Sequence, residues 1–262
     1  MLLEVQNLTV GYARRKERER RLIEGLSLIA PEGRAIGLLG RNGMGKSTLL
    51  RVLAGVQRPI EGRVSVGGVD LAHLSAHDRA CRIAFVTTEP VATAHLRVRE
   101  AVAMGRAPYT GWLGSLSAED LRRVDESLER VGMSAFADMP LDSLSDGERQ
   151  RVMIARAVAQ DTPIVLLDEP GAFLDLPNRY RMALLLRRLA HEMDKTVIYS
   201  SHDLSTAVQI CDLLWLLTPG GIVAGEPAEL LQNGTVDVLF DDLPIRCLPD
   251  GVIRFDRLED RF

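Results

Sequence analysis

The fold of this chain is decided by the stretch Gly40-Arg41-Asn42-Gly43-Met44-Gly45-Lys46-Ser47-Thr48. It fits the phosphate-binding pattern G-x-x-x-x-G-K-[ST] at every fixed position. Residues 35–39 before it form an apolar run typical of a buried strand, and residues 48–54 after it are typical of a helix. Glycines let successive backbone N–H groups turn toward phosphates, and a helix N-terminus adds partial positive charge. A chance glycine-rich turn seldom matches all of this. We therefore predict a triphosphate site, with Lys46 at the β- and γ-phosphates and the Ser47 hydroxyl on Mg²⁺.

The composition limits the class of protein. The chain has 262 residues, 46% hydrophobic and 26% charged, enough for one large domain or a domain with an inserted subdomain. Its net charge of −4 gives no bulk attraction to nucleic acid, so no nucleic-acid partner is expected. No apolar run is as long as a membrane span, and no signal peptide is evident. The three cysteines form no C-x-x-C pair, which disfavours a disulfide framework or zinc site. We expect a soluble cytoplasmic protein.

Strand-like and helix-like segments alternate along the chain. Residues 163–168 form a continuous apolar run ending in an aspartate, as expected of a strand buried on both faces of a parallel sheet. The pattern from about 97 to 160 is helical instead, and near its middle Ser117 and Asp120 would cap a helix with Leu121, Val124, Leu128 and Val131 on one face. The fold class expected is α/β with an all-helical insertion. The other expected strands are 2–10, 26–30, 35–39, 83–86, 196–200, 213–217 and 221–224.

Residues 14–21 are mostly arginine, lysine and glutamate. The simplest interpretation is a solvated hairpin loop between two strands. A basic patch for nucleic acid or anionic lipid ranks below it.

Further polar residues stand where chemistry on a nucleotide needs them. Asp168 ends the apolar run and is followed by Glu169, so the pair can serve Mg²⁺ and polarise an attacking water. His202 follows the strand expected at 196–200, a place where α/β sheets handle ligands. Taken alone, a histidine is more often structural, and two carboxylates at a strand end can be mere surface residues. Residues 144–150 contain a polar turn that is by itself an ordinary helix cap, although its amides can bind phosphate.

Taken together and in this order, these segments resemble an ABC-type ATPase, the nucleotide-binding subunit of an ATP-driven transporter. The resemblance runs from residue 1 to about 231. It implies that Tyr12 stacks on adenine and that residues 40–48 are the Walker A loop. It also implies that residues 164–168 are Walker B, with Glu169 as catalytic base, and that His202 is the switch histidine. Residues 172–175 match the D-loop, which ends at Asp175.

The resemblance implies an architecture as well. The fold would be a P-loop NTPase (RecA-like) mixed sheet, with N-terminal antiparallel β hairpins and an inserted helical subdomain. The ATPase domain would cover 1–236, with the core at about 1–88 and 161–236 and the helical subdomain at about 89–160. Residues 237–262 would form a tail of unclear role.

In this family ATP, with Mg²⁺, is sandwiched between Walker A of one copy and the signature of another. The signature here is Leu-Ser-Asp-Gly-Glu rather than the commoner Leu-Ser-Gly-Gly-Gln. Closure of such a homodimer would drive integral-membrane permease subunits and, indirectly, a substrate-binding protein. The chain would then be cytoplasmic and peripheral on the inner face of a bacterial cell membrane. The residues serving the partner's nucleotide would be Ser145, Asp146, Gly147 and Glu148.

One segment departs from the family pattern. A glutamine that touches Mg²⁺ and the attacking water usually follows the strand at 83–86, but this chain has Thr87-Thr88-Glu89-Pro90. We align Thr88 with the missing glutamine. Either Thr88 works through a water, or Glu89 takes over.

Residues 97–109 contain a Gly-Arg-x-Pro-Tyr stretch similar to importers of iron–siderophore, haem or cobalamin. The bland alternative is a generic amphipathic helix. Rival functions are a soluble ABC ATPase acting on ribosomes or nucleic acid, the ATPase of another transporter class, and a non-catalytic regulatory subunit. The single set of motifs disfavours the first, and the intact Lys46, Asp168, Glu169 and His202 disfavour the last.

Overall fold

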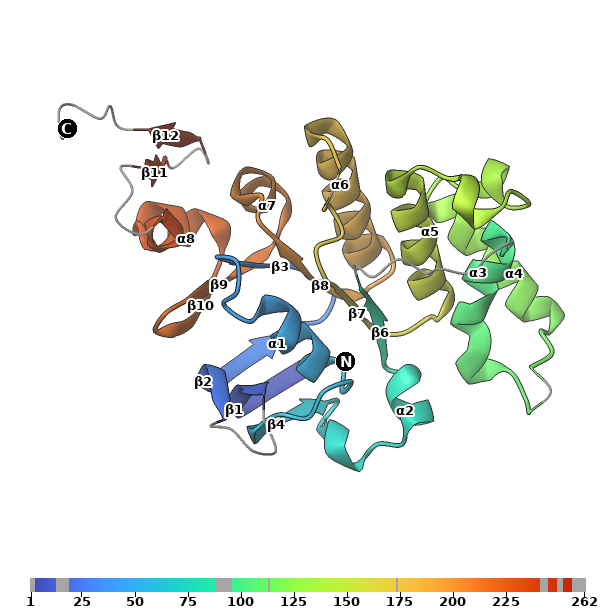
Figure 1. The fold of residues 1–262 in the computed structure, drawn as a ribbon, viewed down its shortest axis with the longest axis horizontal. Helices are drawn as coiled ribbons and strands as arrows, with labels where there is room; N and C mark the ends of the chain where they lie inside the picture. Colours follow the sequence, from blue (N-terminus) through green and yellow to red (C-terminus); the bar gives the residue numbers. More distant parts are fainter. Residues whose placement is uncertain are drawn as a thin grey trace.

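The computed structural model describes residues 3–12, 19–87, 96–112, 114–172, 174–240, 245–248 and 252–255. Two main sheets and a group of helices make up this part of the chain (Figure 1). The expected α/β class with a helical insertion is confirmed.

The N-terminal sheet is antiparallel and has the order β2-β1-β4-β5. Its strands are β1 (Leu3–Tyr12), β2 (Arg20–Ala30), β4 (Glu61–Val66) and β5 (Val69–Asp70). We expected a loop over the whole charge run at 14–21. This expectation is wrong at the end of the run, because Arg20 and Arg21 begin β2. Arg21 extends over the sheet, with its Nη2 2.7 Å from Glu61 Oε1. Residues 13–18 lie outside the described part.

The large sheet has the order β10-β9-β3-β8-β7-β6, and only β10 runs antiparallel to its neighbour. Each strand expected for this sheet is found, and its ends lie within a residue or two of the expected ones. Because the central strands are parallel, their carboxyl ends meet at one edge. The strands are β3 (Ala35–Gly40), β6 (Ile83–Val86), β7 (Ile164–Leu167), β8 (Thr196–Ser201), β9 (Leu213–Thr218) and β10 (Gly221–Gly225).

The buried strand β7 separates two hydrophobic cores, as its uninterrupted apolar run predicts. Ile164 and Leu166 belong to the core shared with α1 (Lys46–Leu53), which lies between the two sheets (Figure 1). Val165 and Leu167 face the other core, with α6 (Leu176–Glu192), α7 (Leu204–Ile210) and the helical insertion. The side chains on both faces of β7 are therefore covered by other parts of the chain.

The insertion between β6 and β7 packs around α5 (Asp146–Ala159), beside the end of the large sheet (Figure 1). Ser117 caps α4 as predicted, since its hydroxyl accepts the Asp120 N–H. One predicted core residue is wrong: Leu121 is 44% exposed, because the buried stripe of this helix runs through Asp120, Val124 and Leu128 and leaves Leu121 beside it. The other elements are α3 (Val98–Ala103), η2 (Met104–Tyr109), α4 (Ala118–Arg130), η3 (Ser134–Phe136) and η4 (Leu141–Ser143).

Short elements complete the fold. They are η1 (Leu71–His73), α2 (Ala76–Ala80), α8 (Pro227–Gln232), η5 (Thr235–Phe240), β11 (Ile245–Cys247) and β12 (Ile253–Phe255). Throughout the described residues, no helix combines the length and apolar character that crossing a membrane requires.

Candidate functional site at the carboxyl edge of the large sheet

The glycine loop connects β3 to α1 and is shaped by backbone conformations that glycine allows. Gly43 and Gly45 have φ angles of 79° and 105°, in the left-handed region that side chains with a Cβ avoid. Gly40 is needed for space instead, because a Cβ there would lie 2.9 Å from the Leu217 Cβ of β9. The sequence therefore fixes both the turn and its close seat on the sheet. Met44, the loop residue with an apolar side chain, packs against the core beneath α1.

Lys46 is the first residue of α1 and lies folded over the loop. Its Nζ donates to the carbonyl oxygens of Gly40, at 2.7 Å, and Arg41, at 3.2 Å. The side chain is only 5% exposed, and burial lowers the pKa of its ammonium, against the opposing charges of Glu169 and Asp168. The ammonium is thus held at the centre of the loop, where an incoming phosphate would meet it.

Ser47 and Asp168 come together although 121 residues separate them in the sequence. The Ser47 hydroxyl donates to Asp168 Oδ1 at 2.9 Å, which brings the start of α1 against the end of β7. A second hydroxyl, that of Ser200 on β8, donates to the same oxygen at 2.8 Å. Sequence reasoning missed Ser200. The signal was a serine in a fully buried strand, where a hydroxyl requires a partner.

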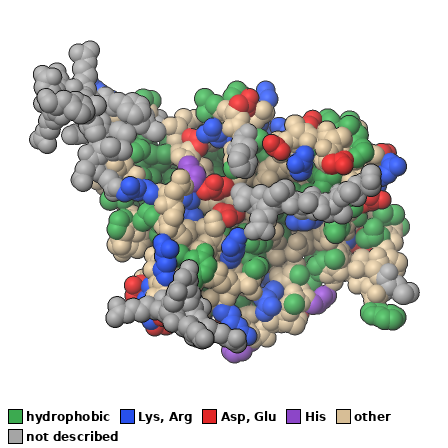
Figure 2. Space-filling model, in the orientation of Figure 1, with side chains coloured by type: hydrophobic (Ala, Val, Ile, Leu, Met, Phe, Trp, Pro, Cys, Tyr) green, Lys and Arg blue, Asp and Glu red, His purple; other side chains and the backbone are tan. Residues whose placement is uncertain are grey.

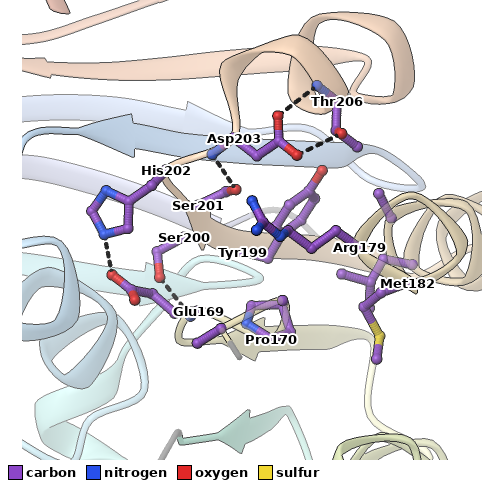
Figure 3. Close-up of a pocket in the computed structure, with 14 residues that line it drawn as sticks. Glu169, Pro170, Arg179, Met182, Tyr199, Ser200, Ser201, His202, Asp203 and Thr206 are labelled. Carbon is purple, nitrogen blue, oxygen red and sulfur yellow. Dashed lines mark hydrogen bonds and ion pairs between the residues drawn. The ribbon is translucent and has the colours of Figure 1, made fainter. Parts of the chain in front are cut away.

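Glu169 follows directly and is held by β8 and the residue after it. Its backbone N–H donates to Ser200 Oγ at 2.8 Å, and its Oε1 lies 2.5 Å from His202 Nε2 (Figure 3). Its φ of 44° is uncommon for a residue with a side chain and turns the carboxylate out of the strand direction. The predicted base and histidine therefore form one hydrogen-bonded pair.

Two hollows have Glu169 in their lining. One, of about 190 Å³, lies between β8 and α6 and is lined by Glu169, His202, Arg179 and Tyr199 (Figure 3). The other, of about 320 Å³, opens over the glycine loop. Figure 2 shows acidic, basic and histidine side chains gathered near the middle of this face. The second hollow is lined by Tyr12, Arg20, Leu22, Asn42, Gly43, Gly45, Lys46, Ser47, Thr48 and Glu169.

Tyr12 also lines the hollow over the loop. Its hydroxyl lies 2.9 Å from Thr48 Oγ1, and the side chain remains 43% exposed. An aromatic ring with one exposed face at the rim of a phosphate loop is suited to stack on a flat base. The lining of the hollow thus combines an aromatic side chain with the Lys46 side chain.

The segment 145–148 forms the start of α5. Ser145 caps α5 and shares a capping box with Glu148, whose Oε2 accepts the Ser145 hydroxyl at 2.6 Å. These hydrogen bonds lower the pKa of the Glu148 carboxyl. No residue of this segment lines the hollow over the glycine loop.

The remaining predicted residues occupy other positions. Asp175 caps α6, its Oδ1 accepting the Asn178 N–H at 3.0 Å. Thr88 and Glu89 lie outside the described residues.

Comparison with known proteins adds family and relatives to this geometry. Residues 23–172 match the ABC transporter family. The chain is 37% identical over 246 residues to the achromobactin transport ATP-binding protein of Dickeya dadantii, which covers 94% of this chain and 89% of that protein. It is 35% identical over 237 residues to the iron(3+)-hydroxamate import ATP-binding protein of Bacillus subtilis, covering 90% and 86%. It is 38% identical over 242 residues to the cobalamin import ATP-binding protein of Halobacterium salinarum, covering 92% and 59%.

Solved structures give the same picture. A metal-chelate type ABC transporter in an inward-facing conformation superposes with a TM-score of 0.79 at 30% identity, covering 93% of this chain and 90% of that one. A dimeric ATP-binding cassette in a post-hydrolysis state, bound to ADP and Pi, has a TM-score of 0.75 at 28% identity, covering 86% and 98%.

Proposed function

Because this chain belongs to the ABC transporter family, we propose that it hydrolyses ATP to power an importer of iron–siderophore, haem or cobalamin complexes. The observation that carries the ATPase part is the contact between Ser47 and Asp168, 2.9 Å across 121 residues. The contact joins the loop that we propose as Walker A to the strand end that we propose as Walker B, near Lys46, Glu169 and His202.

The chemistry of these side chains suits a magnesium ion. Mg²⁺ prefers oxygen ligands, and the Ser47 hydroxyl and the Asp168 carboxylate offer such oxygens beside the glycine loop. Asp168 is only 5% exposed, and the hydrogen bonds it accepts from described side chains come from hydroxyls. We propose that Ser47 and Asp168 hold the ion, which supplies charge neutralisation at the phosphates.

The roles of the other residues follow from their positions. Lys46 exchanges its carbonyl partners, Gly40 and Arg41, for phosphate oxygens. Tyr12 stacks on the base, and the loop residues 40–48 surround the phosphates. Glu169 Oε1 orients a water and accepts its proton, while His202 Nε2 fixes the direction of that carboxylate.

A complete site needs two copies of the chain. In the role proposed for them, Ser145, Asp146, Gly147 and Glu148 contact the nucleotide held by the partner, with Asp175 at the interface. Their absence from the lining of the glycine-loop hollow of their own chain supports this. The core at about 1–88 and 161–236 and the helical unit at about 89–160 then carry the two halves of each site.

The cargo is proposed from the named relatives and from the Gly-Arg-x-Pro-Tyr stretch. That stretch has a packing role here, since a Cβ on Gly105 would lie 2.2 Å from the Arg156 carbonyl oxygen of α5. Arg106 is buried and donates to Asp120 at 2.8 Å. The stretch thus fixes η2 to the helical unit, which we propose meets the permease.

The location follows as part of the same proposal. We place the chain in the cytoplasm, on the inner face of the cell membrane, with permease subunits and indirectly a substrate-binding protein as partners.

The test is affinity purification of the tagged chain from detergent-solubilised membranes of its own host. We expect membrane permease subunits to co-purify, and the complex in liposomes to take up a ferric siderophore, haem or cobalamin when ATP is supplied. Recovery with ribosomes or nucleic acid alone would contradict the importer assignment. Recovery of permeases without uptake of any of these cargoes would contradict the cargo.

A further inference from the structure

Two adjacent arginines at the start of β2 have opposite surroundings. Arg21 is surrounded by acids: its guanidinium lies 2.7 Å from Glu61, 3.2 Å from Glu19 and 3.5 Å from Glu24. Arg20 makes no ion pair or side-chain hydrogen bond with any residue in the described ranges. Successive side chains of a strand point to opposite faces, so the two guanidinium groups reach different surfaces.

Arg20 points to the face that carries the nucleotide site. It is paired directly with Tyr12 of β1, and side chains of directly paired antiparallel residues lie side by side on the same face. Both residues line the hollow over the glycine loop. Leu22, two residues along and on the same face, is close enough to the loop that a Cβ on Gly45 would lie 3.2 Å from its Cβ. The residues at 20 and 22 thus form one wall of that hollow.

The other residues that line the hollow indicate which group of a nucleotide the Arg20 guanidinium would contact. Lys46 lies at the loop end, where the β- and γ-phosphates are expected, and Tyr12 lies at the base end. A side chain beside Tyr12 cannot form a second stacking surface opposite it, since paired residues stand about 5 Å apart on one face. The negative group nearest the base in any adenine nucleotide is the α-phosphate.

We infer that Arg20 is a further nucleotide-binding residue, whose guanidinium contacts the α-phosphate beside the base stacked on Tyr12. This inference rests on the nucleotide site proposed above. The site would then contain two cations with different roles. Lys46 contacts the terminal phosphates, whereas Arg20 contacts the α-phosphate, which ATP, ADP and AMP share.

The test compares Arg20→Gln with the matched control Arg21→Gln, both in the full chain. Binding of ATP, ADP and AMP is measured by calorimetry at about 0.05 M and about 0.5 M NaCl, since salt screens exposed charges. We expect Arg20→Gln to weaken all three nucleotides by the same factor, about fivefold at low salt and less at high salt. Arg20→Lys should recover part of the loss, and Arg21→Gln should bind like the wild type.

The outcomes separate this inference from the proposed function. Wild-type binding by Arg20→Gln at both salt concentrations would overturn the inference alone, as would a loss confined to ATP. An equal loss in Arg21→Gln would also overturn it, because the effect would then belong to the strand. A wild-type chain that binds no ATP would contradict the proposed function and the inference with it. Equal melting temperatures of the two glutamine variants would show that β2 is intact in both of them.

Discussion

His202 Nε2 lies 2.5 Å from Glu169 Oε1, and Ser200, two residues before that histidine, accepts the Glu169 backbone N–H at 2.8 Å. The end of β8 therefore holds both the backbone and the carboxylate of Glu169. Parallel pairing of β7 with β8 makes this possible, because it aligns the carboxyl ends of the two strands. The following predictions test what this arrangement does.

Replacing Glu169 by Gln removes the proton acceptor but keeps the shape and a hydrogen-bonding group for His202. We expect ATP affinity within about twofold of wild type, and steady-state hydrolysis lower by at least about 100-fold. Because hydrolysis no longer reopens the dimer, the variant should elute as an ATP-bound dimer in light-scattering chromatography. A monomer that turns over ATP at the normal rate would contradict the role of Glu169.

Replacing His202 by Ala leaves the Glu169 carboxylate without the partner that directs it. We expect kcat to fall about 10- to 100-fold, with KM little changed, since the loss is one of orientation rather than of binding. Ser201→Ala, at the neighbouring residue, serves as control. Equal effects of the two changes on kcat would argue for a general disturbance of the strand end instead.

The Ser47–Asp168 contact predicts a specific dependence on magnesium. Ser47→Ala removes one of the two proposed oxygen ligands, so the Mg²⁺ concentration for half-maximal ATP hydrolysis should rise at least about tenfold. Ser47→Thr keeps the hydroxyl and should stay near wild type. An unchanged Mg²⁺ requirement in the alanine variant would rule out Ser47 as a ligand.

A site shared by two copies predicts complementation between inactive variants. Lys46→Ala disables the loop of its own chain. Ser145→Asp keeps a good helix cap but places a carboxylate where the partner's phosphates would lie. Each variant alone should be inactive, but an equal mixture forms mixed dimers with one intact site and recovers on the order of a quarter of wild-type activity.

The control for complementation is a mixture of Lys46→Ala with Glu169→Gln. Both changes lie in the half-site that a chain builds for its own nucleotide, so no mixed dimer has an intact site. Activity in this mixture, or none in the first, would contradict the two-copy site.

The buried pair in the helical unit predicts a dependence of stability on pH. Hydrogen bonds from Ser117, together with Arg106, lower the pKa of Asp120 from 3.8 to about 2. Since folding lowers this pKa, the ionised Asp120 carboxylate stabilises the folded chain. This stabilisation is complete above the unfolded-state pKa of 3.8 and is lost as the pH falls toward 2. Asp120→Asn should therefore lower the free energy of unfolding by about 2 kcal/mol at neutral pH, because it leaves Arg106 buried without its charged partner.

This prediction is checked by urea unfolding at about pH 7, 5 and 3.5, where the gap between wild type and Asp120→Asn should narrow only at the lowest value. Asp125→Asn, at an exposed carboxylate on the same helix, should change stability by less than about 0.5 kcal/mol. A gap that stays constant at all three pH values would show that the Asp120 charge is not the cause.

Local patterns were enough to predict much of the fold. The run 164–167 predicted a strand buried on both faces, and the glycine loop predicted both its own shape and the start of a helix. Local patterns did not predict where the exposed ends of some elements lie. Arg20 and Arg21 belong to β2 because their backbones pair with Tyr12 and Gly11 of β1, partners that no local pattern reveals. Leu121 fits an apolar helical stripe but lies beside the buried one, because Asp120, paired with Arg106, takes the buried position in that turn.

The candidate site divides in the same way. The sequence by itself determined which residues are candidates for binding phosphate, ion and base, because glycine conformations, helix caps and the order of the motifs are local properties. Only the tertiary structure decided that Ser200 joins Asp168 to Glu169, and that Arg20 rather than Arg21 faces the glycine loop. The reason is that strand pairing brings together residues far apart in the chain, and pairing register decides which of two adjacent side chains reaches the site.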